Sequence, residues 1–141
     1  RLHYAVVGTP NRLEYDQGFF VKGGDGLADV KPIAHLYKTQ VYQLAEQLGV
    51  PKGVTNRPPT TDTYSLAQSQ EGFYFALPAL TMDLVLYALN NGMDAAAAAR
   101  DLGLEADQVE RAYRDIEQKR STTRYLHLGP VLAEPVDELD L

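Results

Sequence analysis

The sequence predicts an α/β fold in which an open, mostly parallel sheet carries helices on its faces and is followed by a helical C-terminal subregion. Two observations support this prediction. Residues 1–7 form an apolar run of the kind seen in strands with neighbours on both sides. Four later segments place apolar residues at helical spacing, and three of them lie beyond residue 80. Because a domain rarely opens on a central strand, we expect further N-terminal sequence to precede residue 1.

Composition limits the class of protein. The 141 residues, 45% of them hydrophobic, suffice for one domain or the larger part of one. A formal net charge of −6 gives no positive field that would attract nucleic acid or an anionic membrane. The absence of cysteine excludes disulfides and thiolate chemistry, and no apolar run approaches the ~20 residues of a membrane span. We therefore expect a cytoplasmic protein with neither nucleic acid nor membrane as partner.

The first strand is followed by a loop and a helix. Residues 8–29 are rich in Gly and Asp, and loops longer than about 12–15 residues are usually functional or disordered. Phe19 and Phe20 within this loop favour an ordered one. Residues 33–48 show helical periodicity, which ends at Gly49.

The second half of the chain begins with a loop and continues as helices. Residues 52–70 are rich in Pro, Thr, Asp and Ser, which predicts an exposed loop. A helix is predicted over residues 81–91, with Thr81 as its N-cap and Gly92 as its stop. Two more helices are predicted at residues 94–101 and 107–120.

Polar residues follow the predicted strand at the edge where open α/β sheets bind ligands. This places Thr9 and Glu14 near a crevice. Glu14 could ligate Mg²⁺, which prefers oxygen ligands, or it could face water. Lys22 and Lys38 could each hold a phosphate, or they could be solvated surface lysines.

Two stretches carry several polar residues in a fixed order. They read GTPNRLEYDQGFFVKGGDGLADVKPIAHLYKTQVYQLAEQLGVP, residues 8–51, and RPPTTD, residues 57–62. Together they resemble the second half of the catalytic domain of NAD synthetases, closely over roughly the first 60 residues and more loosely beyond. The resemblance implies that residues 1–141 are the C-terminal part of that domain, with a Rossmann-like, adenine-nucleotide α-hydrolase-like fold. It also implies a ligase that joins deamido-NAD to ammonia through an adenylated intermediate, using ATP and releasing AMP and diphosphate.

The resemblance implies binding roles for particular residues. Thr9, Lys38 and Thr60 match positions that bind ATP, with Lys38 on its phosphates. Lys22 and Asp29 match groups that hold deamido-NAD. No catalytic acid, base or nucleophile is assigned.

The resemblance also implies that Glu14 is a magnesium ligand. Adenylation by ATP brings several negative charges together, so Mg²⁺ and lysines are needed to offset their repulsion. The expected cofactors are therefore ATP and Mg²⁺, and the intact protein is expected to be a homodimer.

The sequence departs from the family in two respects. Tyr125-Leu126 stands where family members often carry His-Lys that contacts the nicotinate part, so the effect on the acid substrate is left open. The Ser-Gly-Gly-rich pyrophosphate loop that the family keeps at its first strand is absent, so we expect this chain alone to be inactive. The nitrogen source, ammonia or glutamine, is left open by these residues.

Two other functions compete with this one. The first is another adenylating enzyme of the ATP-pyrophosphatase type, which would share the ATP-binding residues. The second is a helix-turn-helix nucleic-acid-binding module at residues 95–120, with its turn at Gly103. The acidic net charge disfavours the second alternative.

Overall fold

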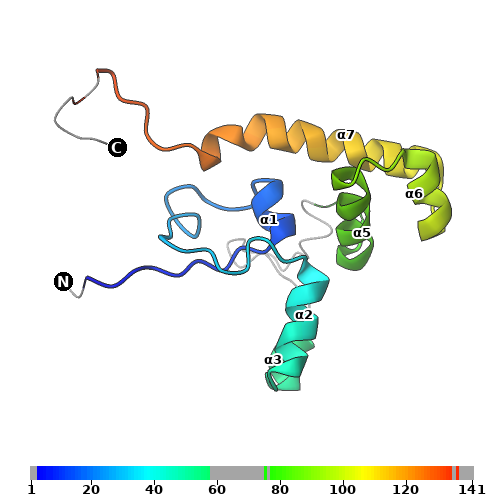
Figure 1. Ribbon diagram of the computed structural model, residues 1–141, viewed down its shortest axis with the longest axis horizontal. Helices are drawn as coiled ribbons and strands as arrows, with labels where there is room; N and C mark the ends of the chain where they lie inside the picture. Colours follow the sequence, from blue (N-terminus) through cyan, green and yellow to red (C-terminus); the bar gives the residue numbers. More distant parts are fainter. Residues whose placement is uncertain (1–2, 58–74, 76, 135, 137–141) are drawn as a thin grey trace, which may run out of the picture.

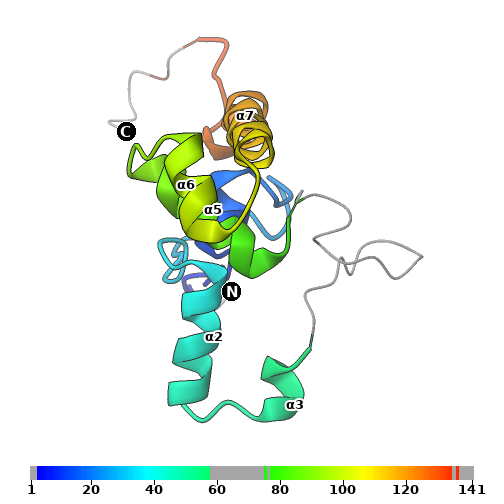
Figure 2. The same cartoon turned by 90° about the vertical axis from the view of Figure 1, so that its right-hand side faces the viewer.

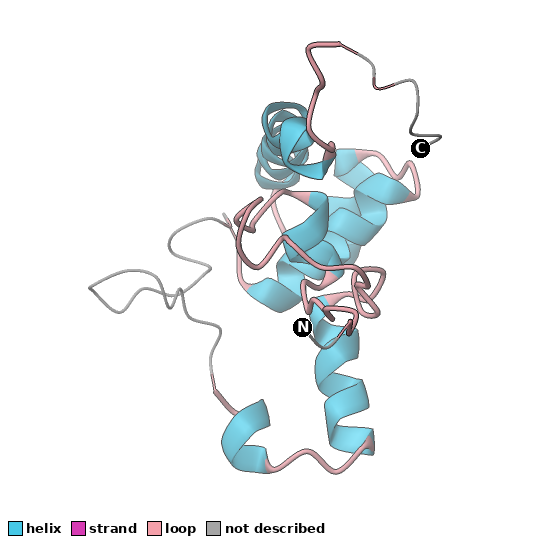
Figure 3. Ribbon diagram, turned by 90° about the vertical axis from the view of Figure 1, so that its left-hand side faces the viewer, coloured by secondary structure: helices cyan, strands magenta, loops and turns pink. Residues whose placement is uncertain are grey.

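The structure is a computed structural model that describes residues 3–57, 75, 77–134 and 136. In this part of the chain the regular elements are helices, joined by loops and turns (Figure 3). Residues 1–7 were predicted to form a strand, but the described residues of this segment make only an isolated parallel bridge, between Val7 and Val30. Tyr4, Val6 and Val7 are 80%, 55% and 60% exposed. A strand needs neighbours to complete its ladder, so the open sheet stays a prediction.

The loop predicted at residues 8–29 contains a short helix, α1 (Arg12–Asp16). A capping box starts it: Asn11 Oδ1 accepts the Glu14 N–H, and Glu14 Oε2 accepts the Asn11 N–H, both at 3.1 Å. Leu13 of α1 is buried in the core. Glu14 therefore lies on a fixed helical turn and not in an open loop.

Two helices project from the rest of the molecule, α2 (Lys38–Gln47) and α3 (Lys52–Thr55) (Figures 1 and 2). The helix predicted at residues 33–48 begins five residues later than expected. No residue of α2 is buried. The loop predicted at residues 52–70 begins with α3, and residues 58–70 lie outside the described part.

The C-terminal half is helical, as predicted. Its elements are α5 (Ala79–Asn90), α6 (Ala95–Leu102), α7 (Ala106–Thr123) and the 3₁₀ turn η1 (Arg124–His127). Helix α7 is the longest of the described helices and runs across α5 and α6 (Figure 1). The core joins α1, α5 and α7 through side chains that are at most 1% exposed: Leu13, Met82, Val85, Leu86 and Ile116.

The caps and stops at the helix ends agree with the predicted ones at some positions and differ at others. Asp94 caps α6 by accepting the Ala97 N–H at 2.8 Å, and positive φ is found at Gly92, where a stop was predicted, and at Gly103, where a turn was predicted. Thr81 was wrongly predicted as the N-cap of α5. The cap is Pro78, whose carbonyl accepts the Met82 N–H at 2.8 Å and closes the first turn.

Candidate functional site

The structure brings together two of the predicted site residues. Lys38 Nζ lies 3.1 Å from Glu14 Oε1, and the two side chains are 17% and 15% exposed. Glu14 is oriented by the capping box of α1, and Lys38 is the first residue of α2. Residues 24 positions apart in the chain thus form a partly buried ion pair.

The Glu14 carboxylate has the chemistry of a magnesium ligand. A carboxylate offers about four lone-pair positions. One of its oxygens accepts from Lys38 and the other from the Asn11 N–H, which leaves acceptor capacity on both. The described residues contain no group of three or more His, Cys, Asp or Glu side chains that could hold a metal ion. Mg²⁺ in proteins commonly binds one or two carboxylates together with waters and phosphates, so a single carboxylate at this position fits such a site.

Lys22 and Asp29 lie in the Gly-rich loop, residues 8–29, and attach it to two other segments. Lys22 Nζ donates to the Tyr125 carbonyl at 2.7 Å and lies 5.9 Å from the centroid of that ring. Asp29 Oδ2 accepts the Val6 N–H at 2.8 Å. Lys22 therefore holds the loop to η1, and Asp29 holds it to the N-terminal segment.

Of the two threonines predicted to bind ATP, Thr9 lies in the described part of the chain. Thr9 is exposed and follows Gly8, whose N–H donates to the Val30 carbonyl at 2.8 Å. Thr60 lies outside the described residues.

An aromatic cluster beside Lys22 was not predicted. The Tyr15 ring lies 5.6 Å from Phe20 and 4.7 Å from His127, and Phe20 lies 5.2 Å from His127. The Lys31 ammonium lies 5.5 Å from the Tyr15 ring centroid. These contacts pack the Gly-rich loop against η1, and the paired phenylalanines in a polar stretch were the only sequence signal for them.

Two further charged residues were missed, and both act from the helical subregion. Asp83 of α5 accepts the Thr39 N–H at 2.7 Å. Arg120 of α7 donates to both oxygens of Asp16. The hydrogen bond with Asp16, and to a lesser degree the negative charges of Asp16 and Glu117, raise the pKa of the Arg120 guanidinium, although burial opposes this.

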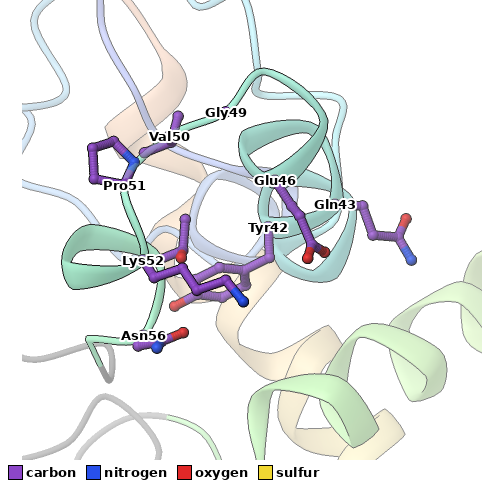
Figure 4. A pocket seen from close by; sticks show the side chains of 9 residues that line it. Tyr42, Gln43, Glu46, Gly49, Val50, Pro51, Lys52 and Asn56 are labelled. Carbon is purple, nitrogen blue, oxygen red and sulfur yellow. The ribbon is translucent and has the colours of Figure 1, made fainter.

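A pocket of about 670 Å³ lies between α2 and α3, where side chains from both helices and the turn between them surround it (Figure 4). Its lining is mixed polar and apolar and includes neither Glu14 nor Lys38. The lining residues are Tyr42, Gln43, Glu46, Gly49, Val50, Pro51, Lys52, Thr55 and Asn56. The pocket is thus separate from the ion pair. None of the described helices is both long and apolar enough to cross a membrane.

Comparison with known proteins identifies relatives over nearly the whole chain. It is 64% identical over 140 residues to the NH(3)-dependent NAD(+) synthetase of Rhizobium meliloti (strain 1021), a match that covers 99% of this chain and 42% of that protein. It is 66% identical over 136 residues to the protein of the same name from Rhizobium rhizogenes (strain K84 / ATCC BAA-868), covering 96% and 41%. The chain therefore spans about two fifths of the length of these curated relatives.

A solved structure shares the fold. The NMN synthetase from Francisella tularensis superposes with a TM-score of 0.67 at 24% identity, covering 91% of this chain and 46% of that one. The family model for NAD synthase matches residues 1–125. The chain belongs to the NAD synthase family.

Proposed function

We propose that this chain is the C-terminal part of the catalytic domain of an ammonia-dependent NAD synthetase. That enzyme is a ligase that forms the amide of NAD from deamido-NAD, ammonia and ATP. The proposal rests on the family match over residues 1–125 together with one geometric observation, the partly buried pair of Glu14 and Lys38. A carboxylate beside an ammonium is a combination suited to a metal–nucleotide complex, because one group attracts Mg²⁺ and the other attracts phosphate.

Within this proposal each candidate residue has a role. Lys38 binds the phosphates of ATP, and Glu14 holds Mg²⁺, which when bound offsets the negative charge of those phosphates. Thr9 and Thr60 bind ATP. In the absence of ligand, Glu14 and Lys38 neutralise each other and keep both side chains in place.

The Gly-rich loop has the second binding role. Lys22 and Asp29 hold deamido-NAD, and their contacts with η1 and with Val6 support this role because they attach residues 22–29 to two other segments. Loop residues whose backbone is tied down at two points lose less conformational entropy when they bind a ligand.

The sheet belongs to the same proposal. Tyr4, Val6 and Val7 are exposed apolar residues in an extended segment, and we propose that they join an open, mostly parallel, Rossmann-like sheet in the complete domain. The shared fold of the Francisella tularensis structure supports this placement. The complete enzyme is proposed to be a cytoplasmic homodimer.

The function is tested on the intact enzyme, meaning a protein of the relatives' full length that contains this chain. The enzyme is supplied with deamido-NAD, ATP, Mg²⁺ and either ammonia or glutamine, and NAD and AMP are measured by liquid chromatography and mass spectrometry. We expect NAD and AMP in equal amounts with ammonia. Failure of the intact enzyme to form NAD would overturn the proposal. The 141-residue chain alone should form none, and NAD formation by it would show that the pyrophosphate loop is not needed.

A further inference from the structure

Asp83 of α5 is a buried acid that contacts the start of another helix. The residue is only 2% exposed, and its Oδ2 accepts the Thr39 N–H at 2.7 Å. Its Oδ1 is buried without a hydrogen-bond partner in the described part of the chain. Burial of a carboxylate is unfavourable unless it is hydrogen-bonded. The bond to Thr39 is therefore the contact through which Asp83 acts on its surroundings.

This contact caps α2 from outside the helix. Thr39 is the second residue of α2, so its N–H has no carbonyl partner within the helix. The N-cap residue, Tyr37, is not one of the residue types that favour that position. Asp83 supplies both an acceptor and a negative charge at the positive end of the helix dipole. Because Thr39 and Asp83 are 44 positions apart, their bond fixes the start of α2 on α5.

Contacts of Tyr37 and Lys38 also hold the start of α2: the Arg12 guanidinium lies 5.4 Å from the Tyr37 ring centroid, and Lys38 pairs with Glu14. The helix buries none of its residues, and it extends away from α5 and α7 (Figure 2). Beside the Asp83 bond, the Tyr37 ring lies 6.1 Å from the Tyr87 ring of α5. Adjacent Cα atoms are about 3.8 Å apart, so any displacement at Thr39 moves Lys38 as well.

We infer that Asp83 is a positioning residue, which holds the first turn of α2 so that the Lys38 ammonium stays opposite Glu14. The inference rests on the proposed function insofar as Lys38 binds phosphate. Its geometric part stands on the two bonds alone: Asp83 to Thr39 at 2.7 Å, and Lys38 to Glu14 at 3.1 Å. The Asp83 carboxylate bonds to the Thr39 backbone and not to Glu14 or to the Lys38 ammonium. It therefore acts on Lys38 through the backbone of α2.

The test is a double-mutant cycle in the intact enzyme, with kcat and the KM for ATP measured for Asp83→Ala, Lys38→Gln and the double variant. We expect each single variant to lower kcat/KM for ATP at least about tenfold, because small misplacements of a binding group are costly. The double variant should be no more than about threefold worse than Lys38→Gln, since Asp83 acts through Lys38. The KM for ammonia should change little. Equal losses from Asp83→Ala with and without Lys38 would overturn the inference.

Two variants separate positioning from simple loss of stability. In Asp83→Asn the amide oxygen can still accept the Thr39 N–H, so most of the loss in kcat/KM for ATP should be recovered. Asp94→Ala removes the same kind of cap from α6, where Asp94 accepts the Ala97 N–H at 2.8 Å. This control should loosen α6 and leave the KM for ATP unchanged. A rise in that KM equal to the one in Asp83→Ala would show that any lost cap has this effect.

A second measurement distinguishes failure of the inference from failure of the proposed function. Exchange of the Thr39 amide hydrogen, followed by NMR, should accelerate at least about tenfold in Asp83→Ala and remain slow in Asp94→Ala. If Lys38→Gln leaves ATP kinetics unchanged, the phosphate-binding role of Lys38 fails, and Thr39 exchange then decides the positioning alone. Unchanged exchange in Asp83→Ala would overturn it.

Discussion

Arg120 and Asp16 form a two-point hydrogen bond, with the guanidinium Nε and Nη2 atoms 2.6 and 2.7 Å from the two carboxylate oxygens. The same Nη2 donates to Asn90 Oδ1 at 2.6 Å. Since Asp16 ends α1, Asn90 ends α5 and Arg120 lies on α7, one side chain joins three helices. Glu14 lies two residues before Asp16, so this contact supports the helix that carries the candidate magnesium ligand.

Removal of this contact should destabilise the protein locally. Arg120→Ala leaves a carboxylate that is 14% exposed without its partner. We expect a loss of about 1–2 kcal/mol, below the full value of a buried charged hydrogen bond because the Arg120 side chain is 34% exposed. Thermal unfolding and amide exchange of α1 measure the loss. Arg114→Ala, an exposed arginine on the same helix, is the control and should change stability by less than about 0.5 kcal/mol. Equal effects of the two variants would remove the role given to Arg120.

Gly18 is expected to reject any side chain. Its φ of +70° disfavours other residues, and a Cβ at this position would collide with the Thr123 side chain at the end of α7. Gly49 has the same backbone conformation, φ +72°, but nothing within 4 Å of the added atom. Gly49→Ala should therefore cost only about 1 kcal/mol of strain, and Gly18→Ala clearly more. Melting temperatures of both variants measure the difference, and equal shifts would argue against the packing of this turn on α7.

Glu14→Gln keeps the size of the side chain and removes its charge. In the intact enzyme we expect the adenylation rate to fall more than about tenfold, or ~1.4 kcal/mol of barrier, and the magnesium requirement to rise. Initial rates over a range of Mg²⁺ concentrations measure both effects. Glu110→Gln, on the exposed side of α7, is the control. A wild-type rate for Glu14→Gln at limiting Mg²⁺ would remove the metal role.

Local signals in the sequence predicted the helical half of the fold. The helices predicted at residues 94–101 and 107–120 are α6 and α7, with shifts of one to three residues at their ends, and the predicted turn at Gly103 lies between them. The predicted start of α2 was five residues too early. The Leu36 carbonyl accepts the Arg12 N–H at 2.7 Å, and this bond to a distant segment takes the place of a bond within a helix. The spacing of apolar residues within 33–48 carries no information about a contact with Arg12.

The candidate site was predictable only in part. The strand over residues 1–7 depends on neighbouring strands, which local sequence cannot supply. The structure pairs Glu14 with Lys38, a contact that the sequence did not predict, and the ligands of both residues stay proposals. The burial of Asp83 could not be predicted, because an acid on a helix is usually exposed and only tertiary packing buries this one.

The central claim is that this chain serves an enzyme that adenylates the carboxylate of deamido-NAD, and the fate of the carboxylate oxygens tests it most directly. The intact enzyme is given deamido-NAD labelled with ¹⁸O in that carboxylate, together with ATP, Mg²⁺ and ammonia. Displacement of AMP by ammonia leaves one carboxylate oxygen on the amide and carries the other away on AMP. We predict one ¹⁸O atom in AMP for each NAD formed, measured by mass spectrometry. NAD formed with unlabelled AMP, or with the label in inorganic phosphate or diphosphate, would contradict the account.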